Sequence, residues 1–195
     1  MTTERPSWSP DVFDRLYAAS EDPWGFHTSP YEREKYAATL AALPERRFAS
    51  AFEIGCSIGV LTRQLAGRCD RLLSVDVAEA ALEAARRHCT GLDHVEFRRM
   101  HVPGEWPEQG FDLVVLSEVL YFLGPADLAL TAERVAASLS PGGLALLVNW
   151  TGETNSPSTG DEAATLFMAA AAPQLTPALH RRAPQYRLDL LRRSD

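Results

Sequence analysis

Residues 52–60 read Phe52-Glu53-Ile54-Gly55-Cys56-Ser57-Ile58-Gly59-Val60, and the chain changes there from a short apolar strand to a helix. Glycines in such a turn let the backbone approach a ligand, and the N-terminus of the following helix presents free N–H groups to it. Asp76 follows 21 residues after Gly55, at the end of the next apolar strand, where a carboxylate can accept hydrogen bonds from both hydroxyls of a ribose. The segment therefore predicts a ligand of the adenosine type.

The spacing of the glycines distinguishes two ligand classes. A dinucleotide fold needs G-x-G-x-x-G, and of the three positions required only Gly55 matches, because Ser57 and Val60 stand at the other two. An acidic residue followed by G-x-G-x-G fits better, since Glu53 and Gly59 are in place and only Ser57 departs. A carboxylate at position 53 would repel a pyrophosphate but suits the ammonium group of a methionine moiety and a nearby sulfonium. The alternative is that these glycines only allow a helix to pack closely on a strand.

The rest of the chain alternates short apolar strands with amphipathic helices, which is typical of a parallel sheet covered on both faces. Strands are expected at Ala51–Ile54, Leu72–Val75, Val95–Met100, Phe111–Leu116 and Leu144–Asn149. Helices are expected at Val60–Ala66, Ala78–Cys89, Asp161–Ala172 and Pro125–Leu139, the last closed by a turn at Pro141-Gly142-Gly143. Tyr186–Leu190 alternates as a strand at one edge of the sheet. The predicted fold class is α/β, a Rossmann-like doubly wound and mainly parallel sheet with an antiparallel edge strand.

The N-terminal residues predict two helices ahead of the sheet. Ser9-Pro10-Asp11 supplies a cap and a first-turn proline, and Ser29-Pro30-Tyr31-Glu32 predicts a capping box. At 195 residues the chain has room for one domain of ordinary size. We expect a single domain over residues 1–195, with an N-terminal helical cap (1–45), a cofactor-binding core (48–150), and a loop, a helix and edge strands (151–195).

Composition excludes several function classes. The 19 basic and 26 acidic residues give a net charge of −7, which argues against a nucleic-acid partner. No apolar run approaches the roughly 18 residues of a membrane span, and residues 1–10 lack a signal-peptide core, so we expect a cytoplasmic protein without a membrane partner. Cys56, Cys69 and Cys89 lack paired spacing, so neither disulfides nor a metal site is expected.

The stretch from Phe48 to Trp150 resembles the class I S-adenosylmethionine-dependent methyltransferases. A narrower resemblance, to the nodulation-protein-S family, rests on Asp22-Pro23-Trp24, Ser29, Tyr31-Glu32, Lys35-Tyr36, residues 52–59, Ser117-Glu118-Val119-Leu120-Tyr121, Gly160-Asp161-Glu162 and Tyr186-Arg187-Leu188-Asp189. Family members of known role methylate the free amine of a deacetylated chitooligosaccharide. The resemblance implies that S-adenosylmethionine is the cofactor and S-adenosylhomocysteine the product. It also implies a small-molecule acceptor, and favours an amino group on a sugar-like molecule.

The resemblance also implies roles for individual residues. Cofactor-binding positions would be Glu53, Gly55, Ser57 and Gly59 around the methionine portion, Asp76 on the ribose, Val77 on the adenine, and Ser117 beside the reactive end. The class often has an Asp after the third strand to receive the adenine amino group. Here Met100-His101-Val102-Pro103 stands instead, which leaves adenine to His101 or to the backbone of His101 and Val102. The loop of Trp24 and the helix of Tyr31 would close over the cofactor.

Methyl transfer is an in-line displacement, so the protein must hold a nucleophile about 3 Å from the methyl carbon. Glu118 is the first candidate to bind or deprotonate the acceptor, although it could instead be a carboxylate bonded to N–H groups at a helix start. His27 is a second candidate for a general base, with a structural role as its alternative. Three other functions remain open: methylation of a hydroxyl, a nicotinamide-dependent oxidoreductase, and a cofactor-binding module without catalysis. The oligomeric state is not predicted.

Overall fold

The computed structural model describes residues 5–194, and their contacts form two compact units. One unit is Ser9–His101, and the other comprises residues 5–8 and 102–194. The division falls inside the stretch 48–150 that was expected to form the cofactor-binding core. The single domain and its three parts stay predictions, and their outer limits, residues 1–4 and 195, lie outside the described residues.

The unit Ser9–His101 contains three parallel strands, β1 (Ala51–Ile54), β2 (Leu72–Asp76) and β3 (Val95–Arg99), in the order β3-β2-β1. Every residue of β1 and β2 is buried, as expected for apolar strands with both faces covered. The register sets Glu53 beside Ser74 and Ile54 beside Val75. The carboxyl ends of β1 and β2 therefore lie together, and the turn after β1 is next to Asp76.

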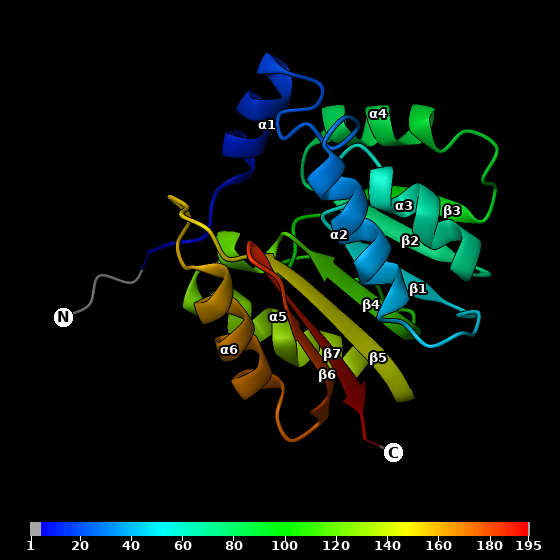
Figure 1. Cartoon of the computed structure of the whole chain (residues 1–195), viewed down its shortest axis with the longest axis vertical. Coiled ribbons are helices and arrows are strands. Elements are labelled where there is room, and N and C mark those ends of the chain that lie inside the picture. Colours follow the sequence, from blue (N-terminus) through cyan, green and yellow to red (C-terminus); the bar gives the residue numbers. More distant parts are fainter. Residues whose placement is uncertain (1–4, 195) are drawn as a thin grey trace. The chain divides into compact units, whose positions relative to one another are not determined.

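Four α-helices and one 3₁₀ helix complete this unit: α1 (Pro10–Ala19), α2 (Pro30–Ala41), α3 (Val60–Leu65), η1 (Ala66–Arg68) and α4 (Glu79–His88). Helix α1 lies beside α4 (Figure 1). Tyr17 is the buried residue of α1, and it packs with Phe13 against the small side chains of Ala78, Ala81 and Ala84. Two aromatic side chains packed on alanines thus help to attach α1 to the rest of this unit.

The capping box predicted at α2 is only half formed. The Ser29 hydroxyl accepts a hydrogen bond from the Glu32 N–H at 3.3 Å, as predicted, but the Glu32 carboxylate accepts from Lys35 Nζ at 3.0 Å. Lys35 is 2% exposed, so a buried ammonium attracts the carboxylate more strongly than a backbone N–H does. A complete capping box forms at α6 instead, between Thr159 and Glu162.

The unit of residues 5–8 and 102–194 has four strands in the order β4-β5-β7-β6. They are β4 (Phe111–Ser117), β5 (Leu139–Trp150), β6 (Leu175–Arg182) and β7 (Tyr186–Arg193). Strands β4 and β5 are parallel, whereas β7 pairs antiparallel with both β5 and β6. The predicted strand from Tyr186 is confirmed, but β7 is internal and β6 forms the edge. No strand was predicted at β6 because it is largely exposed and has no apolar alternation.

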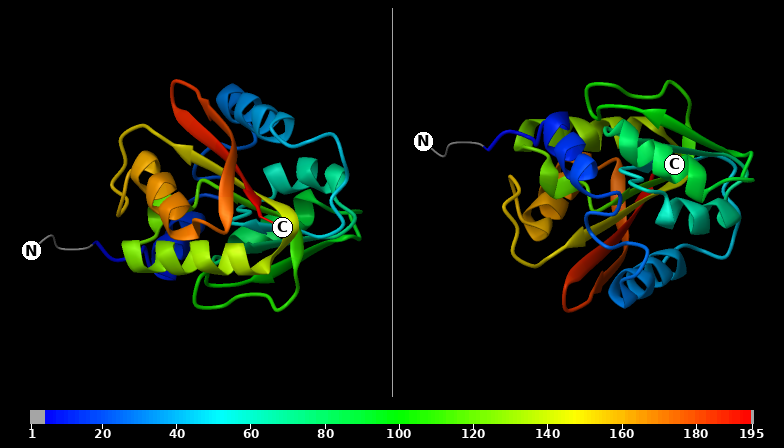
Figure 2. Two further views of the ribbon diagram at one scale, coloured as in Figure 1. Left: turned by 90° about the horizontal axis from the view of Figure 1, so that it is seen from below. Right: turned by 90° about the horizontal axis from the view of Figure 1, so that it is seen from above.

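The helices of this unit are η2 (Leu120–Phe122), α5 (Pro125–Ser138) and α6 (Gly160–Ala171). Helices α5 and α6 pack against each other beside the strands (Figure 2). The turn predicted at residues 141–143 lies within β5, where the pairing with β4 shifts between Leu139 and Leu144 and Gly142 has a φ of 70°. The proline and glycines therefore form an irregularity in a long strand, and β5 begins earlier than expected.

Two predictions from composition can be compared with the structure. Within residues 5–194, no helix has both the length and the apolar character needed to cross a membrane. Cys56, Cys69 and Cys89 are free thiols, and all three are buried.

Candidate functional site

The turn after β1 has a left-handed backbone at every second residue. Gly55, Ser57 and Gly59 have φ values of 77°, 49° and 82°. L-residues with a Cβ avoid this region, which explains physically why the pattern G-x-G-x-G belongs to this turn. Ser57 adopts the conformation although it is not glycine, and its N–H donates to Asp76 Oδ2 at 2.9 Å. The one departure from the pattern therefore keeps the predicted backbone.

Gly59 is also required for packing. A Cβ at this position would lie 3.0 Å from both Cα and Cβ of Ala85 and 3.3 Å from Sγ of Cys89. Close packing is therefore a real function of this glycine. It does not explain the positive φ of Gly55 and Ser57, which the approach of a ligand to the turn would explain.

Glu53 is a buried carboxylate at the end of β1. It is 2% exposed, and its Oε2 accepts hydrogen bonds from Thr62 Oγ1 at 2.6 Å and from Ser74 Oγ at 2.8 Å. Burial raises the pKa of Glu53 to about 7; the charge of Asp76 adds to the rise, and the two hydroxyl donors oppose it. A carboxylate held in this way would be stabilised by a cationic ligand.

Asp76 is the second buried carboxylate of the turn. Its Oδ1 accepts from the Ala78 N–H at 3.0 Å and its Oδ2 from the Ser57 N–H, and the residue is 8% exposed. Burial raises the pKa of Asp76, although these amide donors favour the charged form. Each carboxylate oxygen can accept a further hydrogen bond. The geometry therefore fits the predicted role of accepting from a diol.

Tyr17 is a site residue that sequence reasoning missed. Its hydroxyl lies 2.5 Å from Ser57 Oγ, and its side chain is 7% exposed. In the sequence, Tyr17 is one of several apolar residues on one face of a predicted helix. Its spacing does not indicate a contact with Ser57, which lies 40 residues later in the chain. Only the docking of α1 brings the two hydroxyls together.

The remaining predicted cofactor residues of this unit are less enclosed. Val77 is half-buried, and its carbonyl accepts from Arg99 Nε at 2.9 Å. His101 is exposed just after β3. Trp24 is 40% exposed; its ring centroid lies 5.6 Å from that of Tyr17, in an edge-to-face arrangement. The cofactor-binding roles of these three residues stay predictions.

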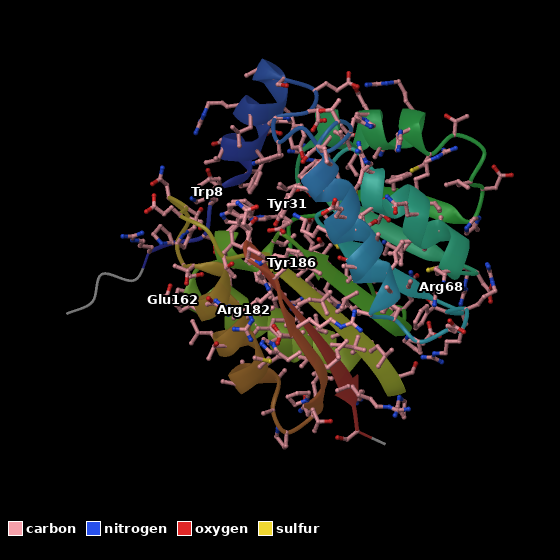
Figure 3. All side chains as sticks on the ribbon, viewed as in Figure 1. Trp8, Tyr31, Arg68, Glu162, Arg182 and Tyr186 are labelled. Carbon is pink, nitrogen blue, oxygen red and sulfur yellow. The ribbon has the colours of Figure 1, made fainter. Side chains whose placement is uncertain are left out.

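Tyr31 lies in the first turn of α2 and is labelled in Figure 3. Lys35 Nζ lies 5.2 Å from the centroid of its ring, close enough for a cation–π interaction. Because Lys35 is buried against Glu32, this part of α2 carries a fixed charge pair beside an aromatic ring. The predicted cofactor-binding role of Tyr31 stays a prediction.

His27 lies beside the end of α4 that is farther from Asp76. Its ring packs edge-to-face on His88, with centroids 4.8 Å apart, and His88 is the last residue of that helix. A helix of ten residues places His88 about 13 Å along the axis from the first turn, which follows Asp76. The pKa of His88 is lowered by burial and by the proximity of His27. The catalytic role of His27 stays a prediction.

In the other unit, Glu118 follows β4 in a left-handed conformation, with φ of 61°. Its N–H donates to the Val148 carbonyl at 2.8 Å, and its Oε2 accepts from the Tyr121 hydroxyl at 2.7 Å and the Trp150 N–H at 2.9 Å. The carboxylate is therefore fixed at the carboxyl ends of β4 and β5. Such a conformation is costly for a residue with a side chain, and costly conformations are frequent at functional sites. Trp150, whose N–H donates to this carboxylate, is the last residue of β5.

Two buried polar side chains accompany Glu118. Among residues 5–194, Ser117 Oγ and both polar atoms of the Asn149 side chain have no hydrogen-bond partner. Val102, predicted near the adenine, is buried in this unit. The segment 151–160 is tightly packed at its end, since a Cβ on Gly160 would lie 1.9 Å from the Trp150 carbonyl oxygen. Figure 3 labels Tyr186, which pairs with Trp150 across β5 and β7.

The family model described as Nodulation protein S (NodS) matches residues 10–141 of the chain. The chain belongs to the nodulation protein S family. A curated relative, nodulation protein S of Rhizobium tropici, is 35% identical over 127 residues, which are 64% of this chain and 53% of that protein. The chain spans about half the length of the curated relatives it matches.

Solved structures agree with this assignment. The N-methyltransferase NodS from Bradyrhizobium japonicum WM9, in complex with S-adenosyl-L-homocysteine, superposes with a TM-score of 0.81 at 23% identity and covers 95% of this chain and 98% of its own. A putative methyltransferase from Pseudomonas syringae has a TM-score of 0.73 at 34% identity, over 84% of this chain and 99% of its own. The predicted Rossmann-like methyltransferase fold and the predicted family are therefore confirmed.

Proposed function

We propose that this family member transfers a methyl group from S-adenosylmethionine to a small-molecule acceptor. The observation that supports the proposal most strongly is the pair of buried carboxylates, Glu53 and Asp76, around a turn with a left-handed backbone at positions 55, 57 and 59. The NodS structure that superposes on this chain contains S-adenosyl-L-homocysteine, the demethylated form of that cofactor. A diphosphate would be repelled by the Glu53 carboxylate, so a nicotinamide dinucleotide is disfavoured.

The residues of the turn fit the cofactor chemically. We assign the ribose hydroxyls to Asp76, because each of its oxygens keeps an acceptor position. We assign the ammonium group of the methionine portion to Glu53, whose buried carboxylate would be stabilised by a positive charge. Gly55, Ser57 and Gly59 let the backbone approach the ligand. When bound, S-adenosylmethionine supplies a methyl group activated by a sulfonium.

Glu118 is our candidate for contact with the acceptor. An amine acceptor would lose a proton as it takes up the methyl group, and the Glu118 carboxylate would receive that proton. Two donors already hold Oε2 of Glu118, so its orientation is fixed before an acceptor arrives. A carboxylate that accepts two hydrogen bonds suits binding an ammonium and taking its proton better than deprotonating a hydroxyl.

An amino group on a sugar-like molecule is the acceptor we favour, and a small-molecule hydroxyl is the alternative. Membership of the nodulation protein S family and the carboxylate of Glu118 both support an amine. We further propose that the protein acts in the cytoplasm, without nucleic acid or a membrane as partner. The net charge of −7 supports the exclusion of nucleic acid.

One experiment tests transfer directly. The purified protein is incubated with isotopically labelled S-adenosylmethionine and a library of amino sugars, amines and phenols, and mass spectrometry detects the gain of one labelled methyl group. Methylated amino sugars are expected, and methylated phenols alone would favour the hydroxyl alternative. Cofactor binding measured by calorimetry without any transfer would indicate a binding module. A protein that binds reduced nicotinamide cofactor and not S-adenosylmethionine would refute the proposal.

A further inference from the structure

The hydrogen bond between Tyr17 and Ser57 joins the N-terminal helix to the turn that we assign to the cofactor. The two hydroxyl oxygens lie 2.5 Å apart, although the residues are 40 positions apart in the chain. Ser57 also uses its N–H to bond Asp76 Oδ2 at 2.9 Å. Ser57 is thus held by two hydrogen bonds, one to the Tyr17 hydroxyl on α1 and one to the Asp76 carboxylate at the end of β2.

Ser57 needs this support because of its backbone. Its φ of 49° lies in the left-handed region, where any residue with a Cβ is disfavoured relative to glycine. In return, Ser57 has a hydroxyl that glycine lacks, and the Tyr17 hydroxyl is its partner. The serine at the middle position of G-x-G-x-G and the tyrosine of α1 therefore depend on each other.

Tyr17 is suited to a fixed role in neutral form. Its side chain is 7% exposed and packs with Ile58 and the alanines of the α4 region. Burial, together with the nearby negative charge of Asp76, raises the pKa of Tyr17 far above its ordinary value, so the hydroxyl keeps its proton at any physiological pH. A hydroxyl that does not titrate keeps Ser57 in place at every working pH.

We propose that Tyr17 is a positioning residue for the cofactor, acting through Ser57. By holding the Ser57 side chain, it keeps the turn left-handed and keeps the Ser57 N–H on Asp76, so that the carboxylate is oriented before the ribose arrives. The inference rests on the proposed cofactor, and it assigns Tyr17 a role that is exerted through Ser57.

The test is a double-mutant cycle on S-adenosylmethionine affinity, measured by calorimetry. Tyr17→Phe removes the hydroxyl and keeps the ring, and Ser57→Gly removes its partner while allowing the same backbone. Tyr17→Phe should weaken binding about fivefold in the wild-type background, the effect of losing one hydrogen bond, and by less than twofold when position 57 is glycine. In turnover assays the KM for the cofactor should rise while kcat and the KM for the acceptor stay unchanged.

A matched control removes a buried hydroxyl elsewhere. Thr131 is fully buried in α5 and donates only within its own helix, to the Asp127 carbonyl at 2.7 Å, so Thr131→Val should lower the melting temperature without changing cofactor affinity. If Tyr17→Phe behaves like this control, or weakens binding equally in both backgrounds at position 57, the positioning role is refuted. Failure of the wild-type protein itself to bind S-adenosylmethionine would instead refute the proposed function.

Discussion

Replacing Glu53 with glutamine should change the stability of the protein and its affinity for the cofactor in opposite directions. Burial raises the pKa of this carboxyl from 4.5 to about 7, and it is 2% exposed. A group whose pKa is higher in the folded protein than in the unfolded chain makes folding less favourable once it ionises. The ionisation of Glu53 therefore costs no stability below pH 4.5, and this cost grows as the pH rises from 4.5 to about 7 and stays constant above that. The shift corresponds to a cost of about 3 kcal/mol in the unliganded protein at pH 8.

Glu53→Gln removes this cost because the amide does not ionise, while its oxygen still accepts from Thr62 and Ser74. The variant should unfold at a higher denaturant concentration than wild type at pH 8, by up to about 3 kcal/mol, and should show little difference at pH 4. Cofactor affinity should change in the opposite direction, because a cationic ligand gains from the carboxylate that the variant lacks. A stabilised protein that binds its ligand more weakly is the expected outcome.

The pH dependence of binding gives the sharper measurement. If the cation binds the ionised form of Glu53, wild-type affinity should be about tenfold higher at pH 8 than at pH 6, because the carboxyl titrates with a pKa of about 7. Calorimetry is done on both proteins at both pH values. Because S-adenosylmethionine titrates equally in the two experiments, its own titration cancels in the ratio of wild-type to variant affinity. A ratio of wild-type to variant affinity that is equal at pH 6 and pH 8 would refute the assignment, as would a variant that is less stable at pH 8.

Three further substitutions test the site. Asp76→Ala should weaken cofactor binding about ten- to a hundredfold through the loss of charge-assisted hydrogen bonds, and an unchanged dissociation constant in calorimetry would contradict the ribose assignment. Gly59→Ala should lower the free energy of unfolding in denaturant by about 2–4 kcal/mol, because the position has φ of 82° and its new Cβ would lie 3.0 Å from Ala85. Gly67→Ala is the control: nothing lies within 4 Å of a Cβ at that position, so this variant should not lose stability. Glu118→Gln should lower kcat at least tenfold with cofactor affinity unchanged, since the amide cannot accept a proton, and wild-type turnover would remove this carboxylate from the mechanism.

Much of the fold could be predicted because it depends on local pattern. Apolar runs separated by helical stripes located β1, β2, β3 and β4 to within one residue at each end, whereas β5 begins five residues before its predicted start. Strand β6 was not predicted, because an exposed edge strand has little need for apolar alternation. The pairing of Glu32 with Lys35 likewise depends on the burial of the lysine, which spacing does not reveal.

The sequence by itself determined the turn: an acidic residue, two glycines and a serine at alternate positions, and Asp76 at the end of the next strand. A backbone with positive φ values favours glycine at those positions, so the requirement can be recognised in the amino-acid sequence. Only the tertiary structure decided which side chains hold the turn and the second carboxylate. Tyr17 reaches Ser57 across 40 residues and the Trp150 N–H reaches Glu118 across 32, and contacts at that range depend on how whole helices and strands pack, which no local pattern encodes.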